Sequence, residues 1–306
     1  STTQRSATLV FTGDIIPDEQ VGQLAEHYGQ ASRDSFDFVP MFERVAAELS
    51  AADLALCHLE TTLAVGASVD GPPNYRAPEQ LAAAIAESGW DGCSVAGEHA
   101  FGHGAQGVAD TIGVLQQAGL GYAGVALDDP TRSQAQRYDA RGIDVAHLSY
   151  TYGLVGDGVP TGQSWWVNII DPNVIALDAS DARADGADFV VVSLHWGEEF
   201  RQAATDDQVV LAAALADSGL VDLVIGHHAH VVQPIERIRD TWIAYGLGNF
   251  LSNQTPGCCG VSSEDGVILQ VSIADSGGVV RVTDISYTPT WVDRVQMQVM
   301  PVAERL

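Results

Sequence analysis

The chain has 306 residues, of which 40 are acidic and 14 are basic, and its formal net charge at pH 7 is -26. This charge argues against nucleic acid or an anionic membrane as a partner, because both require a basic face on the protein. All 14 basic residues are arginines, so a Schiff-base lysine, pyridoxal phosphate attachment and a P-loop are excluded, and an anionic substrate must be held by metal ions or by local arginines.

The length is compatible with one large α/β domain over residues 1–306. No apolar run approaches the ~18 residues that a membrane-spanning helix needs. The first residues lack a basic region followed by a long apolar core, but removal of a signal peptide would leave the same start. A cytoplasmic and an extracellular location both stay open, and so does the oligomeric state.

The first two predicted strands each deliver a carboxylate. Residues 7–12 form an apolar run that leads directly into Gly13 and Asp14, and a carboxylate at such a strand end is well placed to bind a metal. The second strand, residues 53–60, contains His58 and Glu60, which share one face because side chains alternate along a strand. Glu60 is the predicted ligand, whereas His58 is expected to support a ligand or to pack within the strand.

Two further residues precede a predicted helix at positions 78–88. Arg76 is either a clamp for a substrate carboxylate or phosphate, or an ordinary surface salt-bridge residue. Tyr75 is a candidate for the same substrate site.

A third short strand, residues 92–96, ends in another pair of acid and histidine. Glu98 is a candidate metal ligand, and His99 is a candidate general acid. A later strand, residues 143–150, leads to Tyr150 and Tyr152, which either line a pocket or pack in the core.

The four cysteines do not define a redox motif. Cys57 and Cys93 lie in apolar runs, where a small buried residue is expected. The adjacent Cys258 and Cys259 occupy a turn-rich stretch and form either a vicinal disulfide or two loop thiols.

The stretch from residue 188 to residue 250 is the richest in potential ligands. Two apolar runs, residues 189–194 and 223–225, each end in a histidine next to a glycine, which predicts buried strands that carry imidazoles at their C-terminal ends. Such a density of nitrogen and oxygen ligands suits Zn, Mn or Fe. The histidines of this stretch are His195, His227, His228 and His230, and the nearby acids are Glu198, Glu199 and Glu236.

The remaining chain predicts a C-terminal β-hairpin at about residues 264–290. Apolar and polar residues alternate on both sides of an Asp-Ser-Gly-Gly turn. Taken together, the strand ends described above offer ligands that would converge at one sheet edge. This pattern is typical of a binuclear metallohydrolase with two divalent cations, Mn, Zn or Fe.

The sequence resembles the CapA (PgsA-like) family of capsule and poly-γ-glutamate biosynthesis proteins, within the calcineurin-like metallophosphoesterase superfamily. The resemblance extends from about Leu9 to Leu251 through GDIIPDEQV, HLETTLA, YRAPEQL, AGEHAFGHGAQG, SLHWGEEF, GHHAHVVQPIE and IAYGLGNF. It implies a four-layer α/β/β/α sandwich with the site on one edge and His99 as the proton donor. By motif match the metal ligands would be Asp14, Glu60, Glu98, His195, His227 and His230, with His228 ranked lower because related forms vary there.

One position departs from the family pattern. Where the family usually has Asn-Asn-His-Ala-Leu-Asp, this chain reads Gly-Glu-His-Ala-Phe-Gly over residues 97–102. Glu98 therefore stands at the position of an amide ligand. The added negative charge should tighten the binding of divalent cations and weaken their activation of the substrate.

Three functions are compatible with this sequence. The first is a metal-dependent hydrolase of an amide bond, γ-glutamyl or a related isopeptide, with Glu98, His99 and Arg76 at the reacting groups. The second is a phosphomonoesterase or phosphodiesterase with the same metals, and the third is a non-catalytic component of a polymer synthesis or export complex. The expected contacts to a small or oligomeric anionic substrate are Tyr75, Arg76, Tyr150, Tyr152, Glu199 and Asn249.

Overall fold

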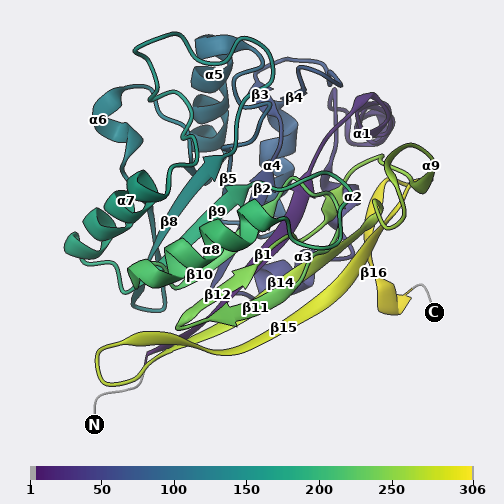
Figure 1. Cartoon of the computed structure of the whole chain (residues 1–306). Helices are drawn as coiled ribbons and strands as arrows, with labels where there is room; N and C mark the ends of the chain where they lie inside the picture. The colour runs from purple at the N-terminus through teal and green to yellow at the C-terminus, as the bar shows by residue number, and fades with distance from the viewer. Residues whose placement is uncertain (1–4, 305–306) are drawn as a thin grey trace.

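The computed structural model describes residues 5–304 as two β-sheets that lie face to face, with helices on both outer faces (Figure 1). The first sheet has eight strands in the order β16-β15-β14-β1-β2-β5-β6, with β13 also paired to β1. The second has six strands in the order β11-β12-β10-β9-β8-β7, and β3 and β4 form a separate small pair. This arrangement is the α/β/β/α sandwich that the family resemblance implies.

The strands of the first sheet are β1 (Ser6–Ile15), β2 (Leu54–Leu59), β5 (Gly92–Ser94), β6 (Gly121–Ala123), β13 (Asn249–Leu251), β14 (Asp265–Asp275), β15 (Val280–Asp293) and β16 (Gln298–Pro301). Those of the second sheet are β7 (Gln136–Ala140), β8 (Ile143–Thr151), β9 (Phe189–His195), β10 (Leu223–His227), β11 (Ile235–Ile238) and β12 (Thr241–Ala244). The small pair is β3 (Thr62–Ala64) and β4 (Arg76–Pro78).

The helices are α1 (Glu19–Ser32), α2 (Val39–Phe42), α3 (Ala46–Ser50), α4 (Glu79–Glu87), α5 (Gly104–Gln117), α6 (Asp129–Arg132), α7 (Pro172–Ala184), α8 (Asp206–Ser218) and α9 (Pro256–Cys259), with a 3-10 turn at Val302–Glu304. No helix among residues 5–304 combines the length and apolar character needed to cross a lipid bilayer.

Three apolar layers hold the sandwich together. Strand β9 shows why its sequence is apolar throughout: Phe189 and Val191 pack between the two sheets, whereas Val190 and Val192 pack under α7 and α8. A strand that is buried on both faces needs apolar side chains at every position. The third layer joins the first sheet to α1, α2, α4 and α5 on the opposite side (Figure 1).

The direction of the central strands brings their C-terminal ends to one edge. Strand β1 is parallel to β2, and β2 is parallel to β5. In the second sheet β8, β9 and β10 are mutually parallel. Because connections between parallel strands return outside the sheets, the residues that follow these strands collect at one end of the sandwich.

The C-terminal hairpin is part of the first sheet. Strands β14 and β15 pair in antiparallel register, and β14 also pairs with β1 along most of its length. The hairpin corresponds to the segment predicted at about residues 264–290, and Figure 1 shows it as a long ribbon along the edge of the molecule.

The expectation that Cys57 and Cys93 are simple buried residues is wrong. The two residues are direct neighbours in the register of β2 and β5, and their sulfurs form a disulfide. The adjacent Cys258 and Cys259 form a second, vicinal disulfide in α9. Neither pairing follows from spacing along the chain, because the first depends on how two strands align.

Candidate metal centre

The acids and histidines at the ends of the parallel strands meet in one cluster that is almost wholly buried. They come from β1, β2, β5, β9 and β10 and from the residues that follow these strands. Several groups of three have one ligand atom each within 4.8 Å of the others. We call this set the cluster; its members are Asp14, His58, Glu60, Glu98, His99, His195, Glu199, His227, His228 and His230.

Asp14 is the best-connected carboxylate of the cluster. Its Oδ1 accepts a hydrogen bond from His227 Nδ1 at 2.9 Å, and its Oδ2 accepts one from His230 Nδ1 at 3.1 Å. The backbone N–H of His228 also donates to Oδ2, at 3.1 Å. Burial alone would raise the pKa of Asp14, but the bonds from His227 and His230 outweigh it and hold that pKa well below its ordinary value.

Gly13 is required by the close approach of another segment. The backbone N–H of Asp14 donates to Gly248 O at 2.9 Å. A Cβ atom at Gly13 would lie 2.1 Å from that same carbonyl oxygen. The glycine in front of Asp14 therefore lets β1 run against residues 247–248, which places the carboxylate under the histidines.

His58 is the residue whose role the sequence defines least. Its Nδ1 lies 2.8 Å from Ser94 Oγ, and its Nε2 lies 3.1 Å from His195 Nδ1. Its ring also stacks on His227 with 4.1 Å between the ring centroids. Burial lowers the pKa of both His58 and His195 well below the ordinary value, so both rings are neutral and His58 orients His195.

Ser94 gives no signal in the sequence. It becomes important only because β2 and β5 align His58 opposite Ser94.

Glu60 and His230 form the second strongly perturbed pair. Burial raises the pKa of Glu60 well above its ordinary value. Burial opposes the protonation of His230, but Glu60 and Asp14 outweigh it and raise the pKa of His230 to about 9. His230 Nε2 lies 3.9 Å from Glu60 and from Glu199, so this imidazole carries a proton in a place where a cation is favoured.

The residues around Glu98 form the other half of the cluster. Tyr152 donates its hydroxyl proton to Glu98, and the Tyr152 ring lies 4.8 Å from the ring of His228. His228 Nδ1 is 3.7 Å from Glu98 Oε1. Burial lowers the pKa of His228 to about 4. The geometry therefore places His228, which motif comparison ranks low, beside Glu98 and His195.

The backbone at His228 and His230 is unusual. Their φ angles are 83° and 54°, in the left-handed region that few residues other than glycine adopt. Such conformations persist where the surrounding structure enforces them, often at functional sites. Here they turn consecutive imidazoles of the GHHAH segment toward different parts of the cluster.

His99 and Tyr75 lie together at one side of the cluster. The two rings meet edge to face at 4.7 Å. His99 Nδ1 donates to the carbonyl of Pro73 at 2.8 Å, while its Nε2 lies 3.6 Å from Glu98 and 3.7 Å from Glu60. Nε2 is thus the nitrogen that faces the carboxylates of the cluster.

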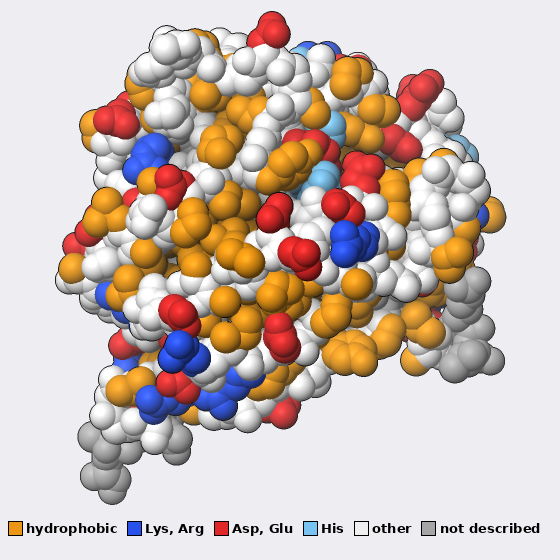
Figure 2. All heavy atoms as spheres, viewed as in Figure 1, with side chains coloured by type: hydrophobic (Ala, Val, Ile, Leu, Met, Phe, Trp, Pro, Cys, Tyr) orange, Lys and Arg blue, Asp and Glu red, His pale blue; other side chains and the backbone are white. Residues whose placement is uncertain are grey.

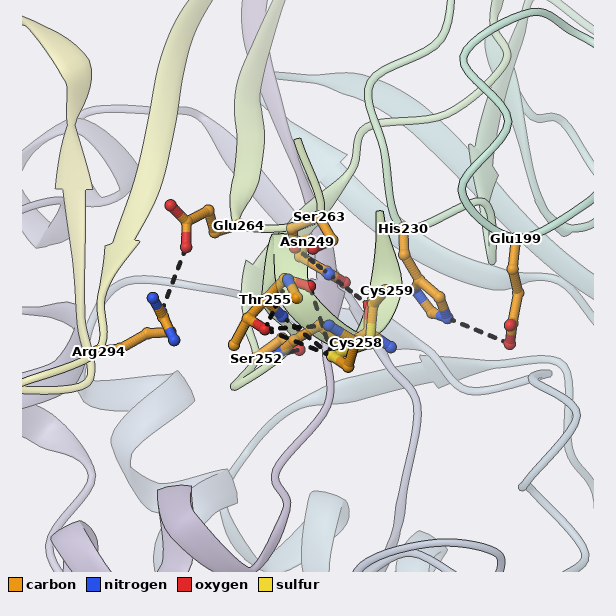
Figure 3. Close-up of a disulfide and its surroundings, with 12 residues drawn as sticks. Glu199, His230, Asn249, Ser252, Thr255, Cys258, Cys259, Ser263, Glu264 and Arg294 are labelled. Atoms are coloured by element: carbon orange, nitrogen blue, oxygen red, sulfur yellow. Dashed lines mark hydrogen bonds and ion pairs between the residues drawn. A yellow bond between two sulfur atoms is a disulfide. The ribbon is translucent and has the colours of Figure 1, made fainter. Parts of the chain in front are cut away.

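Asn249 and Glu199 also border the cluster. Asn249 pairs with Asp14 in the register of β13 and β1. Its Nδ2 donates to Gln254 at 2.9 Å and to the Ser263 carbonyl at 2.6 Å. Figure 3 shows Glu199 beside His230, at the side of the 252–264 segment that carries the vicinal disulfide.

Two predicted substrate contacts lie elsewhere. Tyr150 is fully buried in the layer beneath α7, where its hydroxyl donates to Asp178. Its pocket role is corrected to core packing, because alternation along β8 turns it away from the face that bears Ser149 and Thr151. Arg76 pairs with Asp70 at 2.6 Å, and among the described residues it forms no hydrogen bond or ion pair with the cluster.

The cluster fits divalent metal ions by an observation independent of the motifs. Glu60 Oε2, His195 Nε2 and His228 Nδ1 are buried side-chain atoms without a hydrogen-bond partner among the described residues. Buried polar atoms are normally satisfied, and carboxylate oxygen and neutral imidazole nitrogen are ligands for Zn, Mn and Fe. The triples Asp14, Glu60, His230 and Glu98, His195, His228 share no residue. Figure 2 shows histidine side chains at the surface with acidic ones around them.

Comparison with known proteins agrees with this geometry. The profile of the bacterial capsule synthesis protein family PGA_cap matches residues 8–254. The chain belongs to this family. Among its curated relatives, the capsule biosynthesis protein CapA of Bacillus anthracis is 28% identical over 282 residues, which cover 88% of this chain and 64% of that protein.

Two other relatives are similarly distant. The PGA biosynthesis protein CapA of Bacillus subtilis is 29% identical, over 80% of this chain and 63% of its own length. A probable polyglutamine synthesis accessory protein of Mycobacterium tuberculosis is 29% identical, over 80% of this chain and 74% of its own length. This PGA_cap chain therefore spans less than two thirds of the length of the two Bacillus relatives.

Solved structures show the same fold at low identity. A phosphatase from Mycoplasma pneumoniae superposes with a TM-score of 0.53 at 14% identity, covering 94% of each chain. The calcineurin-like phosphoesterase YfkN from Bacillus subtilis superposes with a TM-score of 0.50 at 12% identity, covering 99% of this chain and 93% of that one. The fold of this PGA_cap member is that of the calcineurin-like phosphoesterases.

Proposed function

We propose that this protein is a divalent-metal-dependent hydrolase that cleaves an amide bond, specifically a γ-glutamyl or related isopeptide bond. The names of the relatives connect them with capsule, PGA and polyglutamine synthesis. The cluster supplies the ligands that such a reaction needs, and its unpartnered buried atoms support a role in binding cations.

The observation that carries this proposal is the distribution of charge at the cluster. The carboxylates of Asp14, Glu60, Glu98 and Glu199 surround the imidazoles, and no arginine among the described residues forms an ion pair or hydrogen bond with the cluster. At the reacting centre a phosphate carries up to two negative charges that these carboxylates disfavour, whereas the carbonyl of an amide is neutral there. This difference favours amide over phosphoester substrates.

Each half of the cluster would hold one cation. Asp14, Glu60 and His230 would bind the first, and Glu98, His195 and His228 would bind the second, with His227 held against Asp14. Bound divalent cations activate water and stabilise the negative charge that develops on the substrate. In this arrangement Ser94 and His58 keep His195 in a fixed orientation.

The residues around the cluster would handle the substrate and its protons. Burial lowers the pKa of His99, and its Nδ1 is already committed to the Pro73 carbonyl, so Nε2 would first accept the proton lost by the attacking water and then deliver it to the leaving nitrogen. Tyr75 holds the ring of His99 in place. For Arg76 to bind a substrate carboxylate, its guanidinium would have to leave Asp70.

A phosphoesterase is the second candidate, because the fold is shared with a phosphatase and a calcineurin-like phosphoesterase. A non-catalytic role in a polymer synthesis or export complex is the third. The test is a panel assay in which purified protein is loaded with Mn, Zn or Fe and offered γ-linked glutamyl oligomers, γ-glutamyl amides of other amine-bearing compounds, and aryl phosphate mono- and diesters. Release of new amino groups from the γ-glutamyl substrates is expected.

The outcomes of this assay separate the three candidates. Turnover of the phosphate esters without amide cleavage would replace the first candidate by the second. Inertness toward every substrate with all three metals bound would leave the non-catalytic role.

The disulfides bear on the cellular compartment in which the protein acts. All four cysteines lie in the two disulfides, and disulfides persist in oxidising environments. We therefore place the activity in an oxidising compartment. Mass spectrometry of protein isolated from its native source would test this, since four free thiols would contradict it.

A further inference from the structure

A separate pocket opens directly beside the cluster. It has a volume of about 280 Å³ and lies between Tyr152, the residues after β9 and the first turns of α8. We call it the Tyr152 pocket. Its aromatic and apolar lining residues are Tyr152, Ile170, Trp196 and Leu211, and its acidic lining residues are Glu198 and Asp207.

Tyr152 connects this pocket to the cluster. Its hydroxyl donates to Glu98, and its ring lies 4.8 Å from that of His228 and 6.0 Å from that of His195. Trp196 follows His195 directly in the chain. A group bound in the pocket would therefore be one side chain away from atoms bound at the cluster, where Glu98 contacts Tyr152 through Oε2 and His99 through Oε1.

The lining combines apolar and aromatic side chains with the polar Thr205 and Gln208 and with two acids. Its two carboxylates are Glu198 and Asp207, and the described lining contains no arginine or histidine. Glu198 pairs with Arg201 at 3.0 Å, whereas Asp207 forms no ion pair with any described residue. Asp207 is thus the carboxylate left to interact with a ligand.

The helix end beneath the pocket does not offer an anion site. Thr205 caps the N-terminus of α8 through a capping box, and the acids Asp206 and Asp207 stand in its first turn. These acids already compensate the positive end of the helix dipole. The net preference of the pocket is therefore for a cation with an apolar body.

We propose that the Tyr152 pocket binds an ammonium-bearing aromatic or aliphatic group of the substrate, next to the bond that is cleaved. The assignment of this group to a substrate rests on the proposed hydrolase function. Aromatic faces attract cations, and Asp207 adds a charge-assisted contact. A pocket of this volume suits a group of about the size of benzylamine.

This preference defines the substrate class more narrowly. A homopolymer of γ-linked glutamate presents a carboxylate on both sides of every bond, and one of these would face Asp207. The favoured substrate is a γ-glutamyl unit joined to a different component that carries an amine and an apolar body.

Binding of three matched probes tests the preference for a cation. Benzylamine, benzyl alcohol and phenylacetate share one ring and differ in charge, and titration calorimetry measures their affinities for the metal-loaded full chain. The same titrations on chelated protein remove direct coordination of the probe by a metal. We expect benzylamine to bind about 10-fold more tightly than benzyl alcohol in both forms, and phenylacetate to bind most weakly to chelated protein.

Matched variants locate the binding. Asp207→Asn should lower the affinity for benzylamine about 3-fold to 10-fold, whereas Asp206→Asn removes the same charge from the same helix turn outside the pocket and should change it less than about 2-fold. Ile170→Trp should fill the pocket and abolish binding, while Val210→Trp, at an exposed position of α8, should not.

Two results would overturn the proposal: phenylacetate binding to chelated protein at least as well as benzylamine, or equal effects of the Asp206 and Asp207 substitutions. These tests are independent of turnover. If the three probes bind in the expected order of affinity but no amide is cleaved, the hydrolase function is removed and the pocket remains a cation site. If amides are cleaved and Asp207→Asn leaves the KM unchanged, the proposed role of the pocket is removed and the hydrolase function remains.

Discussion

Carboxylates lie at both ends of the parallel strands, but their partners differ between the two ends. We call the N-terminal ends of these strands the starting end and the C-terminal ends the finishing end. At the starting end, Asp188 pairs with Arg5 at 2.8 Å, and Asp222 pairs with Arg183 and accepts a hydrogen bond from Val190 N. These carboxylates tie neighbouring strands together and are compensated within the chain.

At the finishing end, the carboxylates face imidazoles instead. Asp14, Glu60 and Glu98 have no arginine partner among the described residues. Three of the buried ligand-type atoms at this end have no hydrogen-bond partner there either. The carboxylates at the starting end are thus paired with arginines and tie strands together, whereas those at the finishing end are paired with imidazoles, which are also ligands for metals.

The largest expected effect is at the finishing end. His195→Ala should lower bound metal and reduce turnover about 100-fold or more, while the far-UV circular dichroism spectrum stays unchanged. The reason is that His195 lies at a strand end and contributes little to the apolar layers. Elemental analysis and the panel assay measure both quantities.

The matched control for this variant is His27→Ala, which removes an exposed imidazole from α1. It should bind metal and turn over substrate like the wild type. Retention of metal and activity by His195→Ala would show that the cluster is not the reactive site.

The next effect is at the starting end. Asp222→Asn should lower the free energy of unfolding by about 1 to 3 kcal/mol, because it weakens charged hydrogen bonds to Arg183 and Val190. Metal content per folded molecule should not change. Urea unfolding and elemental analysis test this, and a loss of metal without a loss of stability would contradict the contrast between the two ends.

Glu98→Asn should have a smaller effect, which lowers the affinity for metal and raises kcat. The substitution restores the amide expected for the family and removes one negative charge from the cluster. We expect the affinity for Mn to fall about 10-fold and kcat at saturating metal to rise. Competition with a chelator measures the affinity, and Tyr152→Phe serves as a control that removes the hydrogen bond to Glu98 but keeps the charge.

A simultaneous loss of affinity and kcat in Glu98→Asn would contradict this charge argument. It would show that the carboxylate is needed for the reaction itself.

The smallest effect concerns pH, and we expect metal-free protein to be most stable near pH 6.5. Burial lowers the pKa of His228 to about 4 and that of His147 to about 3. Below the ordinary value of 6.5 the unfolded chain therefore binds more protons, and stability falls with falling pH. His230 has a pKa raised to about 9 despite its burial, chiefly by Glu60 and Asp14, so its contribution is lost as the pH rises from 6.5 through 9.

Thermal unfolding of chelated protein between about pH 4 and about pH 10 measures both limbs. In metal-loaded protein the alkaline decline should disappear, because binding of the cation requires His230 to be deprotonated. A flat midpoint between pH 6.5 and pH 9 without metal would contradict the perturbation at His230.

Much of the cluster can be predicted from local signals at the strand ends, whereas the sandwich is implied by the resemblance to a known family. An apolar run followed at once by Gly13 and Asp14, or by Gly226 and His227, identifies a strand end wherever the strand lies. The partnership of His58 with Ser94 is different, since it depends on the register of β2 and β5.

Side-chain direction is the second quantity that local signals do not supply. Tyr150 and Tyr152 are equivalent in the sequence, yet one packs beneath α7 and the other reaches Glu98. The outcome depends on where β8 ends and on which face its neighbours cover. The pairing of Cys57 with Cys93 was missed for a related reason, because strand alignment brings these two residues together.

The disulfide between Cys57 and Cys93 has a practical consequence for recombinant work. Each cysteine directly precedes a residue of the His58–Ser94 contact, so this covalent link fixes the two strands where they support His195. Protein made in a reducing host would lack the link, and its ligand geometry could relax. Thiol titration of each preparation should therefore come before its metal stoichiometry is compared with that of another batch.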